Sequence, residues 1–181
     1  RAGSKAEMAL PDGTFVHLNA ATNLEYDVNN SKQRLVKLSG EAFFDVAKNP
    51  DCPFKVIIND LQIEVVGTSF NVKTYKKDIV ETSLLSGRIR VSGGSLPHEY
   101  TLSPGQKATY SAMDRTLRIS KADAHVEAGW RDNYLIFEST PLIDVIAQIE
   151  RWYGVEIRLH HKQIAQDLLS GSFRNESIQN V

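Results

Sequence analysis

Residues 54–72 read FKVIINDLQIEVVGTSFNV, and this stretch indicates the class of fold. Apolar side chains occupy every second position from Phe54 to Ile58 and again from Leu61 to Val65. Such alternation places the apolar residues on one face of a β-strand. The polar pair Asn59-Asp60 between the two runs predicts a hairpin. Gly67 interrupts the next run, which predicts a bulge or a close approach of another backbone segment.

The same alternation extends in both directions, from Leu10 to about Ile119. Turn residues such as Pro11-Asp12-Gly13 and Pro104-Gly105 separate the runs at intervals of about ten residues, because proline presets φ and glycine accepts positive φ. We therefore expect a mainly β fold with an α+β tail. Its β region is an antiparallel β-sandwich or an open β-solenoid of about ten short strands.

The pattern changes after Ser120. Residues 121–129 are polar and alanine-rich without alternation, which indicates a hinge between two parts of the chain. We place the boundary so that residues 1–125 form the β-rich domain and residues 126–181 form a second, smaller module.

The second module begins with a β-α-β pattern. Tyr134–Phe137 is typical of a buried strand, and Ser139-Thr140-Pro141 supplies an N-cap hydroxyl and a proline for the first turn of a helix. Gly154 suits the left-handed position after the helix. Val155–Leu159 alternates and predicts a second strand, joined by a right-handed crossover if the two strands are parallel neighbours.

Two weaker patterns follow. Ser170–Phe173 resembles another strand, and Glu176–Val181 resembles the first turn of a helix, so we expect a module that is truncated at its C-terminal end. Within the helix, apolar residues recur at steps of three and four, from Leu142 to Tyr153. We interpret this stripe as the face that covers the module's own sheet.

Composition excludes several classes of protein. Twenty-one Lys and Arg against 22 Asp and Glu leave a net charge of −1, so charge-driven binding of nucleic acid is not expected. The longest apolar run, Tyr134–Phe137, is far shorter than the roughly 20 residues of a membrane helix. Because residue 1 is Arg, we expect a segment of a longer protein whose targeting and anchoring parts lie elsewhere. The single cysteine, Cys52, excludes an internal disulfide.

Several motifs together resemble the periplasmic region of FecR-type transmembrane sigma-factor regulators, in the form found in Bacteroidetes. The resemblance covers almost the whole chain, and the order of the motifs makes it specific. The matching motifs are LPDG (10–13) with LNA (18–20), GEAFFDV (40–46), PFKV (53–56), VVGTSFNV (65–72), residues 84–91, LSPGQ (102–106), Trp130, Pro141-Leu142 and RWYGV (151–155).

This resemblance implies a role in cell-surface signalling, as part of an anti-sigma factor. In such a relay an outer-membrane TonB-dependent receptor reports its ligand-bound state, through its N-terminal signalling domain, to a regulator anchored in the inner membrane by one helix. The regulator controls an extracytoplasmic-function (ECF) sigma factor through a cytoplasmic segment that is absent here, and periplasmic or intramembrane proteases take part. The tail resembles the small βαβ modules at the N-termini of secretins and TonB-dependent receptors.

The resemblance also suggests one covalent reaction, because some family members cleave themselves at a Gly-Thr bond. Here the pair is Gly67-Thr68. A threonine hydroxyl close to the preceding carbonyl attacks it, the acyl group moves from nitrogen to oxygen, and the ester hydrolyses. The alternative is a structural glycine followed by an ordinary strand threonine. The sequence identifies no second residue for proton transfer.

Other residues with chemical potential have simpler interpretations. Glu41 and Asp45 alternate on one strand and are expected on its solvated face. His160-His161 is expected as a surface pair, since neighbours on a strand point to opposite faces. Cys52 lacks a nearby histidine to activate it. Gly93-Gly94 is followed by no lysine and helix of a phosphate-binding loop. We therefore predict a non-enzymatic protein without cofactor or metal.

Partner-binding residues are expected in the tail. Arg and Trp dominate interface energies when exposed, which favours Arg151 and Trp152. A strand edge at Val155, Ile157 and Leu159 could accept a strand of the receptor's signalling domain. The hypothesis from another class is a carbohydrate-binding or hydrolytic β-sandwich, which would require an aromatic-lined cleft with two facing carboxylates.

Overall fold

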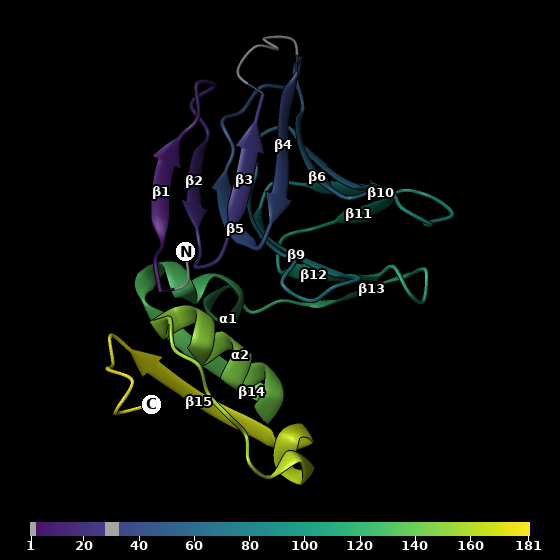
Figure 1. The fold of residues 1–181 in the computed structure, drawn as a ribbon. Coiled ribbons are helices and arrows are strands. Elements are labelled where there is room, and N and C mark those ends of the chain that lie inside the picture. The colour runs from purple at the N-terminus through teal and green to yellow at the C-terminus, as the bar shows by residue number, and fades with distance from the viewer. Residues whose placement is uncertain (1–2, 28–32) are drawn as a thin grey trace.

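The computed structural model describes residues 3–27 and 33–181 (Figure 1). Two sheets pack face to face and form what we call the β domain, residues 3–121. A link, residues 122–133, leads to a small module that we call the tail, residues 134–181. The fold is mainly β with an α+β tail, as the sequence predicts.

The first sheet, sheet A, is antiparallel throughout its seven described strands. In spatial order these are β1 (Ala6–Ala9), β2 (Phe15–Leu18), β5 (Glu41–Asp45), β8 (Ser69–Lys73), β9 (Ile79–Ser86), β12 (Gln106–Ser111) and β13 (Thr116–Lys121).

The second sheet, sheet B, has six described strands, with one parallel pair. Its spatial order is β11 (Tyr100–Leu102), β10 (Ile89–Gly93), β7 (Leu61–Val65), β6 (Phe54–Ile58), β4 (Arg34–Ser39) and β3 (Asn23–Tyr26). Strands β4 and β6 are parallel because β5, which lies between them in sequence, belongs to sheet A. The edge strands β1, β3 and β11 are short and lie outside the set of about ten predicted strands.

The core of the β domain lies between the two sheets. Phe44 of sheet A stacks on Phe70 with 5.2 Å between ring centroids, and Phe54 of sheet B lies 5.8 Å from Phe44. All three side chains are fully buried. Because both sheets contribute to one apolar cluster, the β domain is a sandwich rather than a solenoid.

The stretch 54–72 forms the predicted hairpin and then changes sheet. Ile58 pairs with Leu61 across the turn, so β6 and β7 are neighbours in sheet B. The chain then crosses to β8 in sheet A. A Cβ atom at Gly67 would lie 2.9 Å from Cα of Lys48, so the close backbone approach predicted for this glycine is confirmed.

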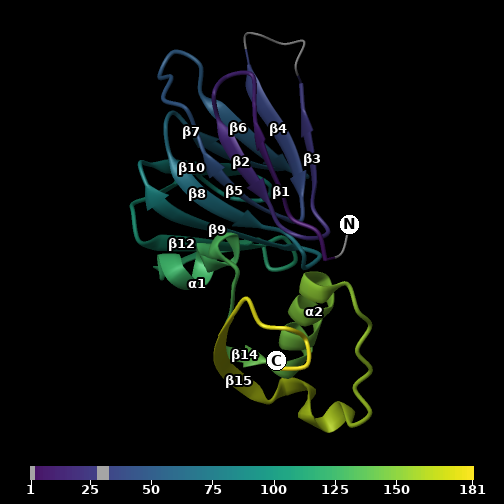
Figure 2. The same ribbon diagram turned by 90° about the vertical axis from the view of Figure 1, so that its left-hand side faces the viewer.

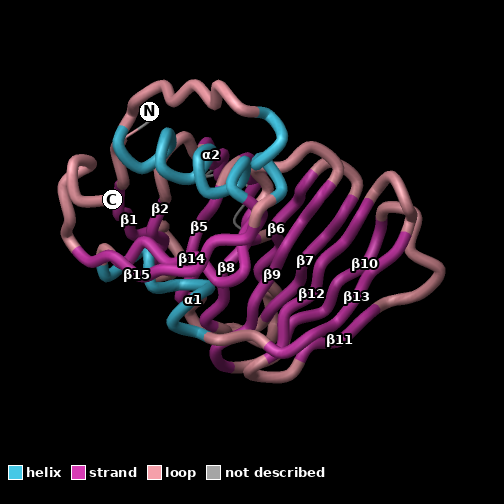
Figure 3. The backbone as a smooth tube through the Cα atoms, turned by 90° about the horizontal axis from the view of Figure 1, so that it is seen from below, coloured by secondary structure: helices cyan, strands magenta, loops and turns pink. Residues whose placement is uncertain are grey.

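The link packs against sheet A through its two short helices, α1 (Ala124–Ala128) and the 3-10 helix η1 (Gly129–Asp132). Asp123 caps α1 by accepting a hydrogen bond from the backbone N–H of His125. The predicted boundary between residues 125 and 126 falls inside α1. Figure 3 shows the helices and the tail over the β1, β2 and β5 side of the β domain, away from β10 and β11.

The tail consists of β14 (Tyr134–Pro141), α2 (Leu142–Tyr153), the 3-10 helix η2 (Lys162–Gln166) and β15 (Leu168–Arg174). Helix α2 ends where predicted, with Gly154 at φ 70° in the left-handed region. Its start differs: Pro141 takes the cap position, and the Leu142 N–H donates to the Asp167 carbonyl instead of to a side-chain cap. Among the described helices, none combines the length and apolar character needed to cross a membrane.

The prediction of a strand at Val155–Leu159 is wrong. The partner of β14 is β15, and the pair is antiparallel, with Tyr134 opposite Arg174, so no parallel crossover forms. Residues 155–159 belong to no strand, and the Ile157 N–H donates to the Glu150 side chain. The strand expected at Ser170–Phe173 is present within β15. Glu176–Val181 contains a hydrogen-bonded turn rather than a helical turn.

Candidate functional site

The candidate site is the contact region between the β domain and the tail. Figures 1 and 2 show α2 between the β domain and the two-stranded sheet of β14 and β15. We call this region the joint and define it by Lys5, Tyr75, Trp130, Arg151 and Trp152. Its members come from separate segments of the chain, which the fold brings together.

One face of α2 covers the tail's own sheet, as its apolar stripe predicts. Val145 packs with Leu135 and Phe137 of β14, and Ile149 and Tyr153 adjoin this cluster. The stripe is therefore the core of the tail, and the opposite face of the helix is left for the β domain.

That opposite face contacts the turn between β8 and β9. Asp144, in the first turn of α2, forms an ion pair with Lys76 at 2.7 Å. In the last turn, the guanidinium of Arg151 lies over the ring of Tyr75, 4.1 Å from its centroid. Burial, with the Glu41 carboxyl nearby, raises the pKa of the Tyr75 hydroxyl to about 12. The tail is thus held at both ends of α2 by polar or cation–π contacts.

Trp152 joins the tail core to the β domain. It packs on the tail cluster and also on a small second cluster of Phe43, Ala128 and Trp130. The ammonium of Lys5 lies over the Trp152 ring, 3.5 Å from its centroid. The predicted partner-binding residues Arg151 and Trp152 are therefore half-buried inside the molecule, where they make intramolecular contacts.

Glu41 lies at the base of the joint, so its predicted place on a solvated strand face is wrong. Its side chain is 7% exposed, because the tail covers the outer face of β5. The amides of Asn19 and Asn71 donate to its two carboxyl oxygens at 2.7 and 3.0 Å. Burial raises the pKa of the Glu41 carboxyl, although Lys73 and these amide donors oppose the shift. Asp45, at the other end of β5, is exposed as predicted.

Asn71 links Glu41 to the second tryptophan. While its amide nitrogen donates to Glu41, its amide oxygen accepts a hydrogen bond from the Trp130 indole at 3.2 Å. Both residues are buried, so this chain of hydrogen bonds fixes the link against sheet A.

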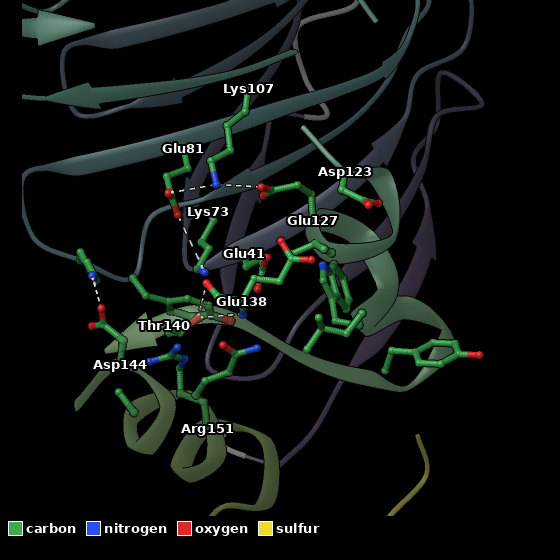
Figure 4. Close-up of a pocket in the computed structure, with 18 of the residues that line it drawn as sticks. Glu41, Lys73, Glu81, Lys107, Asp123, Glu127, Glu138, Thr140, Asp144 and Arg151 are labelled. Carbon is green, nitrogen blue, oxygen red and sulfur yellow. Dashed lines mark hydrogen bonds and ion pairs between the residues drawn. The ribbon is translucent and has the colours of Figure 1, made fainter. Parts of the chain in front are cut away.

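A cavity of 490 Å³ opens beside the joint, between sheet A, α1 and the tail (Figure 4). On its upper wall the Lys107 ammonium lies 2.7 Å from the Glu127 carboxylate and 3.5 Å from that of Glu81. Burial alone would lower the pKa of Lys107, but the two carboxylates outweigh it and raise the pKa. Glu81 and Glu127 thus both form ion pairs with the same lysine.

The structure places Gly67-Thr68 at the crossing between sheets, apart from the joint residues. Thr68 is 3% exposed, and its hydroxyl donates to the Arg88 carbonyl at 3.1 Å. Gly87 lies against this hydroxyl, since a Cβ there would be 2.6 Å from it. The hydroxyl proton is thus engaged by a backbone oxygen, a weak base that does not activate a nucleophile.

The other predicted residues lie on loops of the tail or of the β domain. Val155, Ile157 and Leu159 are half-buried along the segment after α2, and His160-His161 follows them as an exposed pair. Cys52 lies in the turn before β6, where its carbonyl accepts a hydrogen bond from Arg34. Among the residues with a described position, no group of three His, Cys, Asp or Glu is arranged to hold a metal ion.

Sequence reasoning missed Lys5, Tyr75 and Asn71. Lys5 stands in a short polar segment without periodicity, and Tyr75 follows a strand at a position typical of turns. Their role depends on residues more than 50 positions away, so no local pattern could have identified them.

Comparison with known proteins gives consistent matches over both parts of the chain. The model of the FecR protein family matches residues 1–90, and the model of the FecR C-terminal family matches residues 134–181. No curated protein sequence matches significantly.

Two crystal structures match almost the entire chain. Both are of a protein provisionally assigned as an anti-sigma factor, from Parabacteroides distasonis. The first is 31% identical to this chain and the second 32%, and each match covers 99% of this chain. The match covers 85% and 84% of the two crystallised chains, respectively, with a TM-score of 0.90 in both cases.

Proposed function

The chain belongs to the FecR family of anti-sigma regulators, and we propose that it relays the ligand-bound state of an outer-membrane TonB-dependent receptor to an ECF sigma factor. FecR proteins are periplasmic regions of membrane-anchored regulators. We accordingly propose that this chain lies in the periplasm, that a single helix outside it spans the inner membrane, and that the receptor's N-terminal signalling domain docks on the tail.

The observation that carries this proposal is an apolar surface at one end of the tail. Leu168 is 63% exposed, Ile143 45% and Leu169 43%. Leu168 and Ile143 belong to segments that lie side by side, because Pro141 pairs with Leu168 and the Leu142 N–H donates to the Asp167 carbonyl. Leu169 follows Leu168 on β15 and presents its side chain on the other face of the strand. Clustered exposed apolar side chains are costly in water and typically mark a contact surface.

A strand edge accompanies this apolar surface. In the part of the chain that the structure describes, β15 pairs with β14 alone, so its outer edge forms no strand pairing. Strand addition supplies main-chain hydrogen bonds, and side chains such as Leu168 and Leu169 then supply specificity. We therefore propose β15 as the receptor-binding edge, in place of the strand expected at residues 155–159.

The proposal also includes the partner-binding residues that were predicted from the sequence. Val155, Ile157 and Leu159 stay predicted receptor contacts, now as a loop rather than a strand. Arg151 and Trp152 hold the joint, where they would sense a displacement of the tail. A docked receptor domain shifts the protein only if it binds two states with different affinity. The displaced state would then be open to periplasmic or intramembrane proteases, which free or activate the sigma factor.

Titration with the isolated signalling domain of the receptor encoded beside this protein tests the proposal. We expect Leu168→Asp to weaken binding at least about tenfold, because it puts a charge into the proposed contact. Met113→Asp is the matched control, since Met113 is 80% exposed in the turn between β12 and β13. Absence of binding by the unchanged chain, or equal weakening by both variants, would contradict the proposal.

Self-cleavage at Gly67-Thr68 is a separate proposal from the family resemblance. The Thr68 hydroxyl is buried and already donates to a backbone carbonyl, so spontaneous reaction would first require this hydrogen bond to break. The intact mass of the purified protein decides the point. Two fragments with the masses expected for a break between Gly67 and Thr68 support cleavage, and a single species of full mass excludes it under those conditions.

A further inference from the structure

The N-terminal residues of the described chain are bonded to the tail and to the link. The Gly3 N–H donates to the Arg151 carbonyl at 2.8 Å, which satisfies one of the free carbonyls in the last turn of α2. The Lys5 ammonium donates to the Trp130 carbonyl at 2.7 Å and to the Asn133 side chain at 3.1 Å. Residues 3–5 therefore form hydrogen bonds both to the tail, at Arg151, and to the link, at Trp130 and Asn133.

Lys5 also contacts Trp152 of the joint through a cation–π interaction. Its ammonium lies over the Trp152 ring at 3.5 Å from the centroid, and an ammonium at that place is attracted by the negative face of the indole. Trp152 packs against both the tail core and the small cluster of Phe43, Ala128 and Trp130. A displacement of α2 away from sheet A would have to break this contact.

Residues 3–5 are followed immediately by the edge strand β1. In its register Ala6 pairs with Leu18 and Ala9 with Phe15, and β2 is its sole neighbour in the described sheet. All four residues of β1 are exposed. A weakly packed edge strand is thus the mechanical connection between residues 3–5 and the rest of sheet A.

We propose that residues 3–5 are a latch, which couples the position of the tail to the N-terminal end of the β domain. When the tail is displaced, the contacts of Gly3 and Lys5 break together and the segment leading into β1 is released. The role of this latch in signalling rests on the proposed function. The coupling between the tail and residues 3–5 depends only on contacts within this chain.

The environment of Lys5 disfavours the charged form of its side chain. Burial lowers the pKa of the Lys5 ammonium to about 8, against the attraction of the Glu41 carboxylate. The ammonium therefore gives up hydration in the latched state and regains it on opening.

Charge reversal at Lys5 tests the latch. Lys5→Glu would place a carboxylate against the indole face, two hydrogen-bond acceptors and Glu41, all of which repel it. The two tryptophans of the chain, Trp130 and Trp152, both lie in the joint, so their fluorescence reports its opening. We expect a shift of emission to longer wavelength, stronger quenching by acrylamide and a ratio of open to closed protein raised about tenfold.

The matched control is Lys37→Glu, which makes the same charge change at an exposed residue of β4 in sheet B, away from the joint. It should leave emission and quenching as in the unchanged protein, and far-UV circular dichroism should be the same for all three. An unchanged tryptophan signal in Lys5→Glu, or an equal change in the control, would overturn the latch.

A variant at the far end of α2 tests the coupling in the other direction. Asp144→Lys replaces the ion pair with Lys76 by a repulsion and should loosen the tail. If the latch couples the two parts, hydrogen exchange in residues 3–9 becomes faster in this variant, though none of them is changed. Glu156→Lys, in the exposed loop after α2, should not have this effect. Unchanged exchange in residues 3–9 refutes the coupling, whatever the receptor titration shows.

Discussion

At the scale of single residues, Glu41 best shows how position in the fold overrides a local pattern. Its neighbours on β5 alternate as in a strand with one wet face, yet Glu41 and Phe43 are both buried. The face is covered by a module more than 80 residues further along the chain. A carboxyl group kept at such a place is tolerated because Asn19 and Asn71 donate to both of its oxygens.

The buried carboxyl leads to a prediction about pH. Glutamine at position 41 would present an amide N–H₂ to an asparagine N–H₂, so we expect Glu41→Gln to lose about 1–3 kcal/mol of unfolding free energy at acid pH. The pKa of Glu41 is raised in the folded state, so the protonated form is favoured there. The wild-type advantage is therefore complete below the ordinary pKa of 4.5 and declines as the pH rises through the folded pKa.

Urea unfolding of both proteins over a series of pH values measures this difference. Glu25→Gln, on the exposed face of β3, is the control. The difference between its unfolding free energy and that of the wild-type protein should be the same at every pH. A difference between Glu41→Gln and wild type that grows with rising pH would contradict the assignment.

At the scale of elements, the stretch 54–72 and the tail show the strength and the limit of sequence patterns. The hairpin of β6 and β7 follows from alternation and a two-residue turn, which are local. The end of α2 at Gly154 is local as well. In contrast, residues 155–159 alternate but form no strand, because β14 takes β15 as its partner instead. Periodicity indicates which residues suit a strand, and it carries no information on which partner completes the sheet.

The crossing between sheets at Gly67 gives the prediction at this scale. A methyl group there would lie 2.9 Å from Cα of Lys48, a backbone atom that cannot give way locally. We expect Gly67→Ala to lower the unfolding free energy by about 2–3 kcal/mol, as in other overpacked sites. Thermal or urea denaturation measures the loss.

Gly105→Ala separates the steric cost from the conformational one. Gly105 has φ 78°, and a methyl group added there would meet no atom within 4 Å, so only the cost of positive φ, about 1 kcal/mol, should appear. Equal stability of Gly67→Ala and the wild-type protein would show that the crossing is less tightly packed than described.

At the scale of the whole molecule, the β domain and the joint are stabilised by different kinds of contact. The β domain has a large apolar core drawn from both sheets, whereas the joint combines one small apolar cluster with cation–π, ion-pair and amide contacts. Contacts of this kind resemble a transient interface, which favours relative motion of the two parts.

This difference predicts two separate transitions in urea. The fluorescence of Trp130 and Trp152 should change at lower urea than the far-UV circular dichroism, because the joint opens before the sheets unfold. Lys5→Glu should move the first transition alone, and Ile63→Val, in the β core, the second alone. Coincident transitions in the wild-type protein would mean that the joint is as stable as the core.

The sequence by itself determined the β-rich class, the hairpin, the end of α2 and the family, because each depends on residues that are close in the chain or on the order of motifs. Only the tertiary structure decided that Glu41 is covered, that β15 completes the tail sheet, that Lys5 meets Trp152 and that Tyr75 meets Arg151. These contacts join residues separated by up to 147 positions, and they depend on how the β domain and the tail pack together, which no local pattern encodes.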